Sequence, residues 1–161
     1  MNQIARLLPP ANVLIDLEAS SKKRLFESAA LMFENNQGVA QSKVYEALFA
    51  REKLGSTGLG QGIAIPHGRI KGLKEAIGGF LRLKNPVQFD AADGKPVLMA
   101  FVLLVPEAAT ELHLQILSEL AQMFSEKLFR EKLVQASDAL AIHTLFVNWQ
   151  ADAPADRRSA V

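Results

Sequence analysis

Cysteine is absent from this chain of 161 residues. Without thiol groups the protein has no disulfide scaffold, no thiolate nucleophile and no cysteine-based zinc site. Long apolar runs are also scarce: the longest, residues 97–105, is about half the length that a bilayer-spanning helix needs. The N-terminus, MNQIARLLPP, lacks a basic segment followed by an apolar stretch of signal-peptide length. These absences predict a soluble, cytoplasmic protein that does not insert into a membrane.

An overall excess of charge of one sign is missing as well. The chain has 18 Lys and Arg and 17 Asp and Glu, which gives a formal net charge of +1. So balanced a charge argues against a dedicated nucleic-acid-binding protein. Residues 51–84, however, contain seven basic and two acidic residues. This local excess predicts a neighbourhood that attracts anions, although a solvated basic rim explains the same count.

Hydrophobic periodicity and turn residues indicate an α/β fold. Apolar residues make up 49% of the chain, which is typical of a globular protein, and the length suits one domain. Strands are expected at residues 12–17, 76–83 and 96–106. The last of these is apolar throughout, as in a central strand covered on both faces, and turn residues before it make an antiparallel pair with the preceding strand possible. Helices are expected from Ser20 or Ser21 to Asn35, and at residues 42–53, 111–126, 128–134 and 139–146.

The order of these elements predicts a mixed sheet covered by helices. In the helix at residues 111–126, Thr110 is expected as the N-cap and His113 lies in the first turn. The apolar stripe of this helix is expected to consist of Leu112, Ile116, Leu117, Leu120 and Phe124. After residue 149 the chain is small and polar, so we expect residues 150–161 to be a disordered tail.

The stretch from Gly55 to Ile70, GSTGLGQGIAIPHGRI, contains four glycines before Pro66, His67 and Gly68. Glycine allows close backbone approach to a ligand, and Pro66 restricts the residue before it to an extended conformation. The imidazole of His67 is therefore held in a defined position. A loop that ends in a short strand, with His67 as a polar tip, explains the same residues equally well.

Several chemistries lack their motifs. The glycines are not followed by Gly-Lys-Ser/Thr and do not have the spacing G-x-G-x-x-G, the histidines lack paired metal-ligand spacing, and no G-x-S-x-G is present. A histidine nucleophile remains, because a neutral imidazole nitrogen can attack phosphorus. An arginine and a second polar side chain would stabilise the transferring group. Arg51, near a helix end, and His113 could supply these, whereas His143 is expected to be structural.

Two runs, AREKLGSTGLGQGIAIPHGRI (residues 50–70) and HLQILSELA (residues 113–121), resemble the IIA proteins of the mannitol and fructose class of the bacterial phosphoenolpyruvate:sugar phosphotransferase system. The run EKLGSTG (residues 52–58) favours the nitrogen-regulatory branch of this class. The family fold is a five-stranded mixed sheet with helices on both faces. The resemblance therefore implies a single type-2 IIA domain over residues 1–149.

Carried over residue by residue, the resemblance implies that His67 is phosphorylated on Nε2 by the phosphohistidine of a small HPr-like carrier. His113 looks like the second active-site histidine, which hydrogen-bonds the phosphoryl group. Arg51 matches the arginine that stabilises phosphate charge, and Thr57 matches a loop hydroxyl that is expected to bind phosphate. No metal or organic cofactor is implied, because the donor is itself a phosphoprotein.

The chain is thus expected to be a phosphotransferase component in nitrogen regulation, whose phosphorylation state acts on targets such as transporters or sensor kinases. Two alternatives remain open. A sugar-specific IIA protein would pass its phosphate to a separate IIB protein, since a cysteine-free single domain cannot contain that acceptor. A docking module would leave His67 unphosphorylated, with Arg51 and His113 in structural roles.

Overall fold

A computed structural model describes residues 2–108 and 110–151. The tail expected at residues 150–161 lies outside the described residues from residue 152 onward. The helices are α1 (Gln3–Leu7), the 3₁₀ turn η1 (Pro10–Asn12), α2 (Lys22–Gln37), α3 (Gln41–Glu52), α4 (Thr110–Ser125), α5 (Lys127–Gln135) and α6 (Ala139–Asn148). The strands are β1 (Val13–Leu17), β2 (Gly58–Gly60), β3 (Ile63–Ala64), β4 (His67–Ile70), β5 (Ile77–Val87) and β6 (Val97–Pro106).

The strands form one mixed sheet in the order β1-β5-β6-β3-β2, with β4 also paired to β6. β5 and β6 are antiparallel, as the turn residues between them allowed. β3 and β4 pair in parallel with the same edge of β6, one after the other. Because Pro66 has no N–H to donate, the segment beside β6 divides there into two short strands. The described residues therefore form six strands, against the five of the expected family fold.

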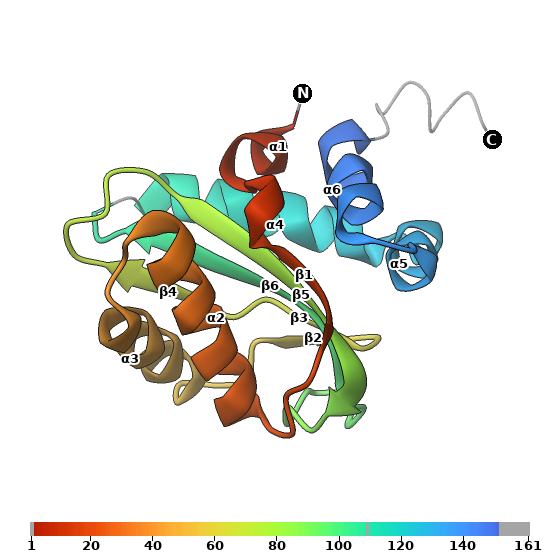
Figure 1. Ribbon diagram of the computed structural model, residues 1–161, viewed down its shortest axis with the longest axis horizontal. Coiled ribbons are helices and arrows are strands. Elements are labelled where there is room, and N and C mark those ends of the chain that lie inside the picture. The colour runs from red at the N-terminus through yellow and green to blue at the C-terminus, as the bar shows by residue number, and fades with distance from the viewer. Residues whose placement is uncertain (1, 109, 152–161) are drawn as a thin grey trace.

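Helices cover both faces of the sheet, which confirms the expected α/β architecture (Figure 1). Successive side chains of a strand point to opposite faces. On β6, Phe101, Leu103 and Val105 pack with α1, α4, α5 and α6, whereas Val102 and Leu104 pack with α2 and α3. This strand is consequently apolar throughout, because both of its faces are buried in a hydrophobic core.

Local signals set the ends of α2: its start agrees with the prediction, and its last residue, Gln37, lies two residues beyond the expected Asn35. The Ser21 side chain accepts a hydrogen bond from the Arg24 backbone N–H at 3.1 Å, and the helix ends at Gly38, whose φ of 69° is the left-handed conformation that glycine adopts readily. The phase of α4 differs from the expectation. Leu112 is 40% exposed and His113 is 9% exposed, so the histidine occupies the first core-facing position of the stripe that Ile116 and Leu120 continue.

None of the helices within residues 2–108 and 110–151 combines the length and the apolar content that crossing a bilayer demands.

Candidate functional site

His67 is the first residue of β4, at the point where the chain resumes pairing with β6 after Pro66. Its Nδ1 lies 2.8 Å from the carbonyl oxygen of Ile65. A carbonyl oxygen only accepts hydrogen bonds, so Nδ1 carries the proton and Nε2 keeps its lone pair. The residue is half-buried. The backbone beside Pro66 therefore selects the tautomer that can act as a nucleophile through Nε2.

Arg51 lies in the last turn of α3 and contacts this nitrogen. Its Nε donates to Nε2 of His67 at 3.2 Å, and its Nη1 donates to the carbonyl oxygen of Gly55 at 2.8 Å. α3 can approach β4 this closely because Gly68 has no side chain. A Cβ atom there would lie 2.8 Å from the Cβ of Ala47. Gly68 thus brings the arginine into contact with the histidine.

His113 completes the cluster from the first turn of α4. The ring centroids of His67 and His113 are 5.0 Å apart, with an interplanar angle of 69°. Nε2 of His113 is buried and has no hydrogen-bond partner among the residues that the structure describes. β6 ends just before α4 and pairs with β4, so the sheet register brings the two histidines together.

Both imidazoles favour the neutral form. Burial lowers the pKa of His67 below its ordinary value, the hydrogen bond to the Ile65 carbonyl opposes this, and the Arg51 charge lowers it further. Burial also lowers the pKa of His113; the charges of Arg69 and Arg51 add to that effect, as does that of His67 when it is protonated. A neutral His67 at pH 7 is the form that can attack an electrophile.

Three of the four expected site residues line one hollow of about 290 Å³, here called the His67 hollow. Its walls are largely apolar, and Leu54, which is 84% exposed, stands at its rim. Thr57 lies outside the hollow: it is buried, and its hydroxyl donates to Oε1 of Glu52 at 2.6 Å. The lining residues are Ala47, Ala50, Arg51, Leu54, His67, Gly68, Arg69 and His113.

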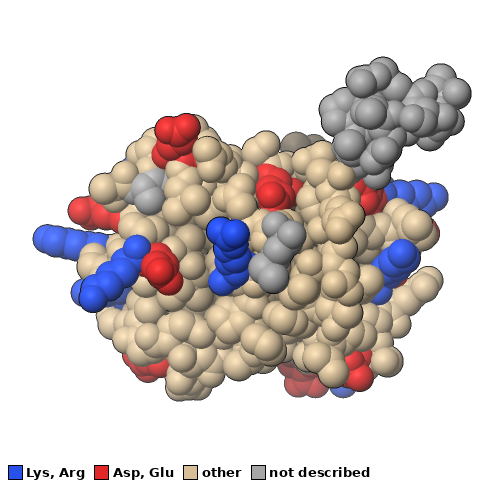
Figure 2. Space-filling view, turned by 90° about the horizontal axis from the view of Figure 1, so that it is seen from above, with Lys and Arg blue, Asp and Glu red and all other residues tan. Residues whose placement is uncertain are grey.

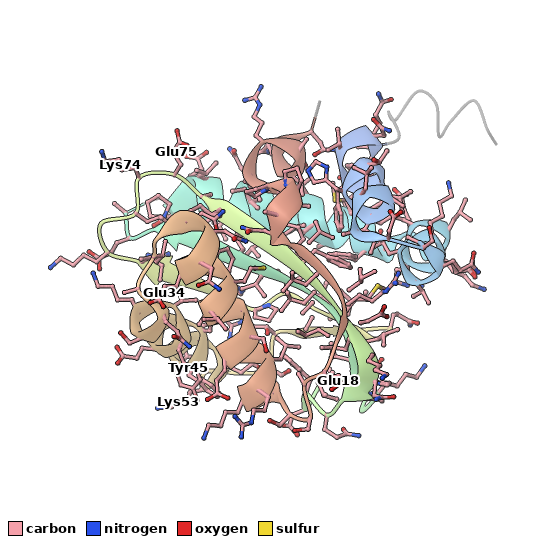
Figure 3. The ribbon with its side chains drawn as sticks, viewed as in Figure 1. Glu18, Glu34, Tyr45, Lys53, Lys74 and Glu75 are labelled. Atoms are coloured by element: carbon pink, nitrogen blue, oxygen red, sulfur yellow. The ribbon has the colours of Figure 1, made fainter. Side chains whose placement is uncertain are left out.

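The basic excess of residues 51–84 converges on the hollow only in part. Arg51 and Arg69 line it, whereas Arg82 donates to backbone carbonyls at the end of α5. Figure 3 shows Lys53 and Lys74 pointing outward at separate parts of the surface. On the face in Figure 2, basic and acidic side chains are interspersed. The positive charge at the site therefore comes from two arginines.

Two contributors were not identified from the sequence. The Ile65 carbonyl selects the tautomer of His67, and Pro66 was its only sequence signal, since proline restricts the preceding residue. Glu52 receives three hydrogen bonds next to Arg51. The sequence feature that could have identified Glu52 is an acidic residue in a segment that is mostly basic. Within the described part of the chain, no three His, Cys, Asp or Glu side chains gather in a way that could hold a metal ion.

Comparison with known proteins supports the expected relationship. The family profile described as "Phosphoenolpyruvate-dependent sugar phosphotransferase system, EIIA 2" matches residues 6–149. The chain belongs to this family. It is therefore a phosphotransferase component of the kind that carries phosphoryl groups between proteins.

Individual relatives agree with this assignment. The chain is 44% identical to a nitrogen regulatory protein of Pseudomonas aeruginosa over 151 residues, which are 93% of this chain and 98% of the relative. The crystal structure of the nitrogen regulatory protein IIA-Ntr from Neisseria meningitidis superposes with a TM-score of 0.85 at 53% identity, covering 89% of this chain and 99% of that one. The expected nitrogen-regulatory type is confirmed.

The mannitol IIA protein of Escherichia coli shares the fold. Its TM-score is 0.71 at 21% identity, with 85% of this chain and 96% of that chain covered. This neighbour and the IIA-Ntr structure together confirm the expected IIA architecture.

Proposed function

We propose that this chain is a nitrogen-regulatory phosphocarrier whose His67 accepts a phosphoryl group from an HPr-like protein, and that residues 1–149 form its single IIA domain. The observation that carries the proposal is the environment of one atom. Nε2 of His67 holds a lone pair, receives the Arg51 Nε–H at 3.2 Å and lies beside the ring of His113 at the edge of the His67 hollow. Phosphoryl transfer depends on positioning and on stabilising the charge of the transferring group, which the nucleophilic nitrogen, the cation and the second imidazole can supply together.

The chemistry would proceed through the lone pair of Nε2. This nitrogen attacks the phosphorus of the donor phosphohistidine, the donor N–P bond breaks, and its electron pair returns to the donor imidazole. The product ring at His67 gains positive charge, which the Nδ1–H···O=C hydrogen bond to Ile65 stabilises. No proton has to leave either partner during the transfer.

Arg51 and His113 would stabilise the charge of the transferring group. The Arg51 Nε–H lies where phosphorus would attach, so its donors are expected to turn to the phosphoryl oxygens as the bond forms. The ring of His113 lies with its centroid 5.0 Å from that of His67, and its buried Nε2 has no partner among the described residues, so we expect it to hydrogen-bond the same group. The neutral state of both rings supports these roles.

Phosphorylation would also change what the site presents to partners. It adds up to about two negative charges beside Arg51 and Arg69. The apolar walls of the hollow and the exposed Leu54 suit a protein surface that docks there. Targets such as transporters or sensor kinases would then distinguish the two forms by charge.

The direct test is phosphorylation in solution. The chain is incubated with phosphoenolpyruvate, enzyme I and an HPr-like carrier, and its intact mass is measured before and after acid treatment. We expect a gain of one acid-labile phosphoryl group that His67→Ala abolishes. His143→Ala is the matched control, because that histidine contacts the carbonyl oxygen of Leu8 and should leave the gain intact.

Two other results would change the assignment. No gain in mass, with the carrier shown to be phosphorylated, would favour a docking module. Rapid transfer from the phosphorylated chain to an added sugar-specific IIB protein would favour a sugar-transport IIA component. The nitrogen-regulatory proposal predicts phosphorylation with little onward transfer to such a IIB protein.

A further inference from the structure

We propose that Glu52 is a positioning residue for phosphoryl transfer: through Thr57 it holds both the arginine and the tautomer of His67. The inference rests on the proposed function. It assigns a role to the buried contacts beneath the His67 hollow rather than to a group that touches phosphate.

Glu52, the last residue of α3, is one of the few buried charged or polar residues and is 8% exposed. Oε1 accepts a hydrogen bond from the Thr57 hydroxyl at 2.6 Å, and Oε2 accepts from the Thr57 backbone N–H at 3.1 Å. Oε2 also pairs with Nζ of Lys22 at 2.9 Å. A buried carboxylate with three donors forms strong, directional contacts, so Thr57 is held at two atoms.

One path from this contact leads to Arg51. Glu52 and Thr57 bracket the turn that contains Gly55, and the Gly55 N–H donates to the Glu52 carbonyl at 3.1 Å. The carbonyl of Gly55 accepts from Nη1 of Arg51 at 2.8 Å. Because the side chain of Glu52 fixes the far end of the turn, it also sets where this carbonyl lies. The guanidinium of Arg51 is thereby held so that its Nε–H points at Nε2 of His67.

A second path leads to His67 itself. The carbonyl oxygen of Thr57 accepts from the Ile65 N–H at 3.0 Å. The carbonyl of the same Ile65 accepts the Nδ1 proton of His67. Thr57 therefore supports the peptide that determines which ring nitrogen carries the proton. A reactive Nε2 needs a free lone pair and the nearby Arg51 cation, and both conditions depend on the carboxylate of Glu52.

The alternative role of Thr57 is direct contact with phosphate. A hydroxyl has one proton, and that of Thr57 is donated to Glu52. The hydroxyl therefore cannot donate to a phosphoryl oxygen while this contact exists. Its burial outside the His67 hollow agrees with a positioning role.

The test compares four variants in the full chain. Thr57→Val removes the hydroxyl at nearly constant volume, and Thr57→Ser restores it. Glu52→Gln removes the carboxylate charge and so weakens the hydrogen bonds to Thr57. Glu46→Gln is the matched control, since Glu46 is an exposed glutamate on the same helix. For each variant, the rate constant and the KM for a phosphorylated HPr-like carrier are measured. The tautomer of the unphosphorylated His67 is determined from imidazole ¹⁵N shifts.

We expect Thr57→Val to lower the rate constant at saturating carrier on the order of tenfold, because small misplacements of reacting groups have effects of this size. Its KM should stay within about twofold of wild type, since the docking surface is unchanged. Thr57→Ser should recover most of the lost rate. The ¹⁵N shifts should show a mixed tautomer in Thr57→Val and Glu52→Gln and a single Nδ1–H tautomer in Glu46→Gln.

A double-mutant cycle distinguishes positioning from direct contact. If Glu52 acts through Thr57, the double variant transfers no more slowly than the slower single variant. If the fold-loss of rate in the double variant equals the product of the losses in the two single variants, the proposal is overturned. That result would indicate that Thr57 touches the phosphoryl group independently of Glu52. If wild type is never phosphorylated, the proposed function fails by itself. The ¹⁵N shifts still decide the positioning in that case, and an unchanged tautomer in Thr57→Val would overturn it.

Discussion

The close approach of α3 to β4 makes Gly68→Ala a sharp probe of the site. The new Cβ would lie 2.8 Å from the Cβ of Ala47, 3.0 Å from its carbonyl carbon and 3.1 Å from its carbonyl oxygen. Carbon atoms pack best at about 3.5–4.0 Å, so α3 must withdraw from β4 by roughly 0.7 Å. Two of the three contacts are backbone atoms, which means that a side-chain rotation cannot relieve the clash.

This displacement has two measurable consequences. Arg51 moves with α3, and its Nε would shift from 3.2 Å toward about 3.9 Å from Nε2 of His67, beyond hydrogen-bond range. We expect phosphoryl transfer to slow by about ten- to a hundredfold. Overpacking should lower the free energy of unfolding by about 1–3 kcal/mol. The assay measures the transfer rate from a phosphorylated HPr-like carrier and the unfolding midpoint in urea.

A second glycine separates the effect on the site from the effect on stability. Gly79→Ala would place a Cβ against Cε of Met32 and 3.3 Å from Cζ of Phe33, both on α2, and none of its nearest contacts belongs to α3. It should lower stability and leave transfer near the wild-type rate. Ala47→Gly in the Gly68→Ala background should restore transfer partly, because the backbone contacts remain. Wild-type transfer by folded Gly68→Ala, or equal slowing by Gly79→Ala, would refute the reasoning.

Two further predictions follow from burial and hydrogen bonding. Because the pKa values of His67 and His113 are lowered from 6.5, the unfolded chain binds protons first as the pH falls. The free energy of unfolding should therefore be highest above pH 6.5 and decrease as the pH falls below it. Over the same pH range the urea midpoint should decrease less in His67→Gln than in wild type. An equal decrease in the two proteins would contradict this prediction. Arg82→Met should lower the free energy of unfolding by about 1–3 kcal/mol, because Nη1 of Arg82 donates to the carbonyls of Leu133, Val134 and Ala136 at 2.9, 3.2 and 2.7 Å. The rate of phosphoryl transfer by Arg82→Met should stay unchanged. Loss of transfer at constant stability would contradict the purely structural role of Arg82.

Much of the fold could be predicted from local sequence. The cap at Ser21 depends on contacts within one helical turn and was readable from residue type, whereas α2 runs two residues beyond the predicted Asn35. The apolar run from Val97 to Val105 identified the strand that lies between two cores, because both of its faces must be hydrophobic. The motif around His67 was likewise sufficient for the resemblance to the IIA family, which the comparisons confirmed.

Long-range geometry could not be obtained in this way. The pattern of α4 allowed Leu112 in the apolar stripe, and packing against the sheet decided that His113 faces inward. The division into β3 and β4 depends on pairing with β6, to which Pro66 contributes no N–H. The resemblance implies a phosphate-binding role for Thr57, and only the structure shows that its hydroxyl donates a hydrogen bond to Glu52.

The sequence by itself determined the elements, the family and the identity of the nucleophile candidate, because those rest on residue types and on contacts between near neighbours. Only the tertiary structure decided the reactive geometry. The register that sets His67 opposite Leu103 brings β4 to the start of α4. The missing side chain of Gly68 lets α3 bring Arg51 against the same ring. These contacts join residues from separate elements, and their distances depend on how the whole sheet and its helices pack.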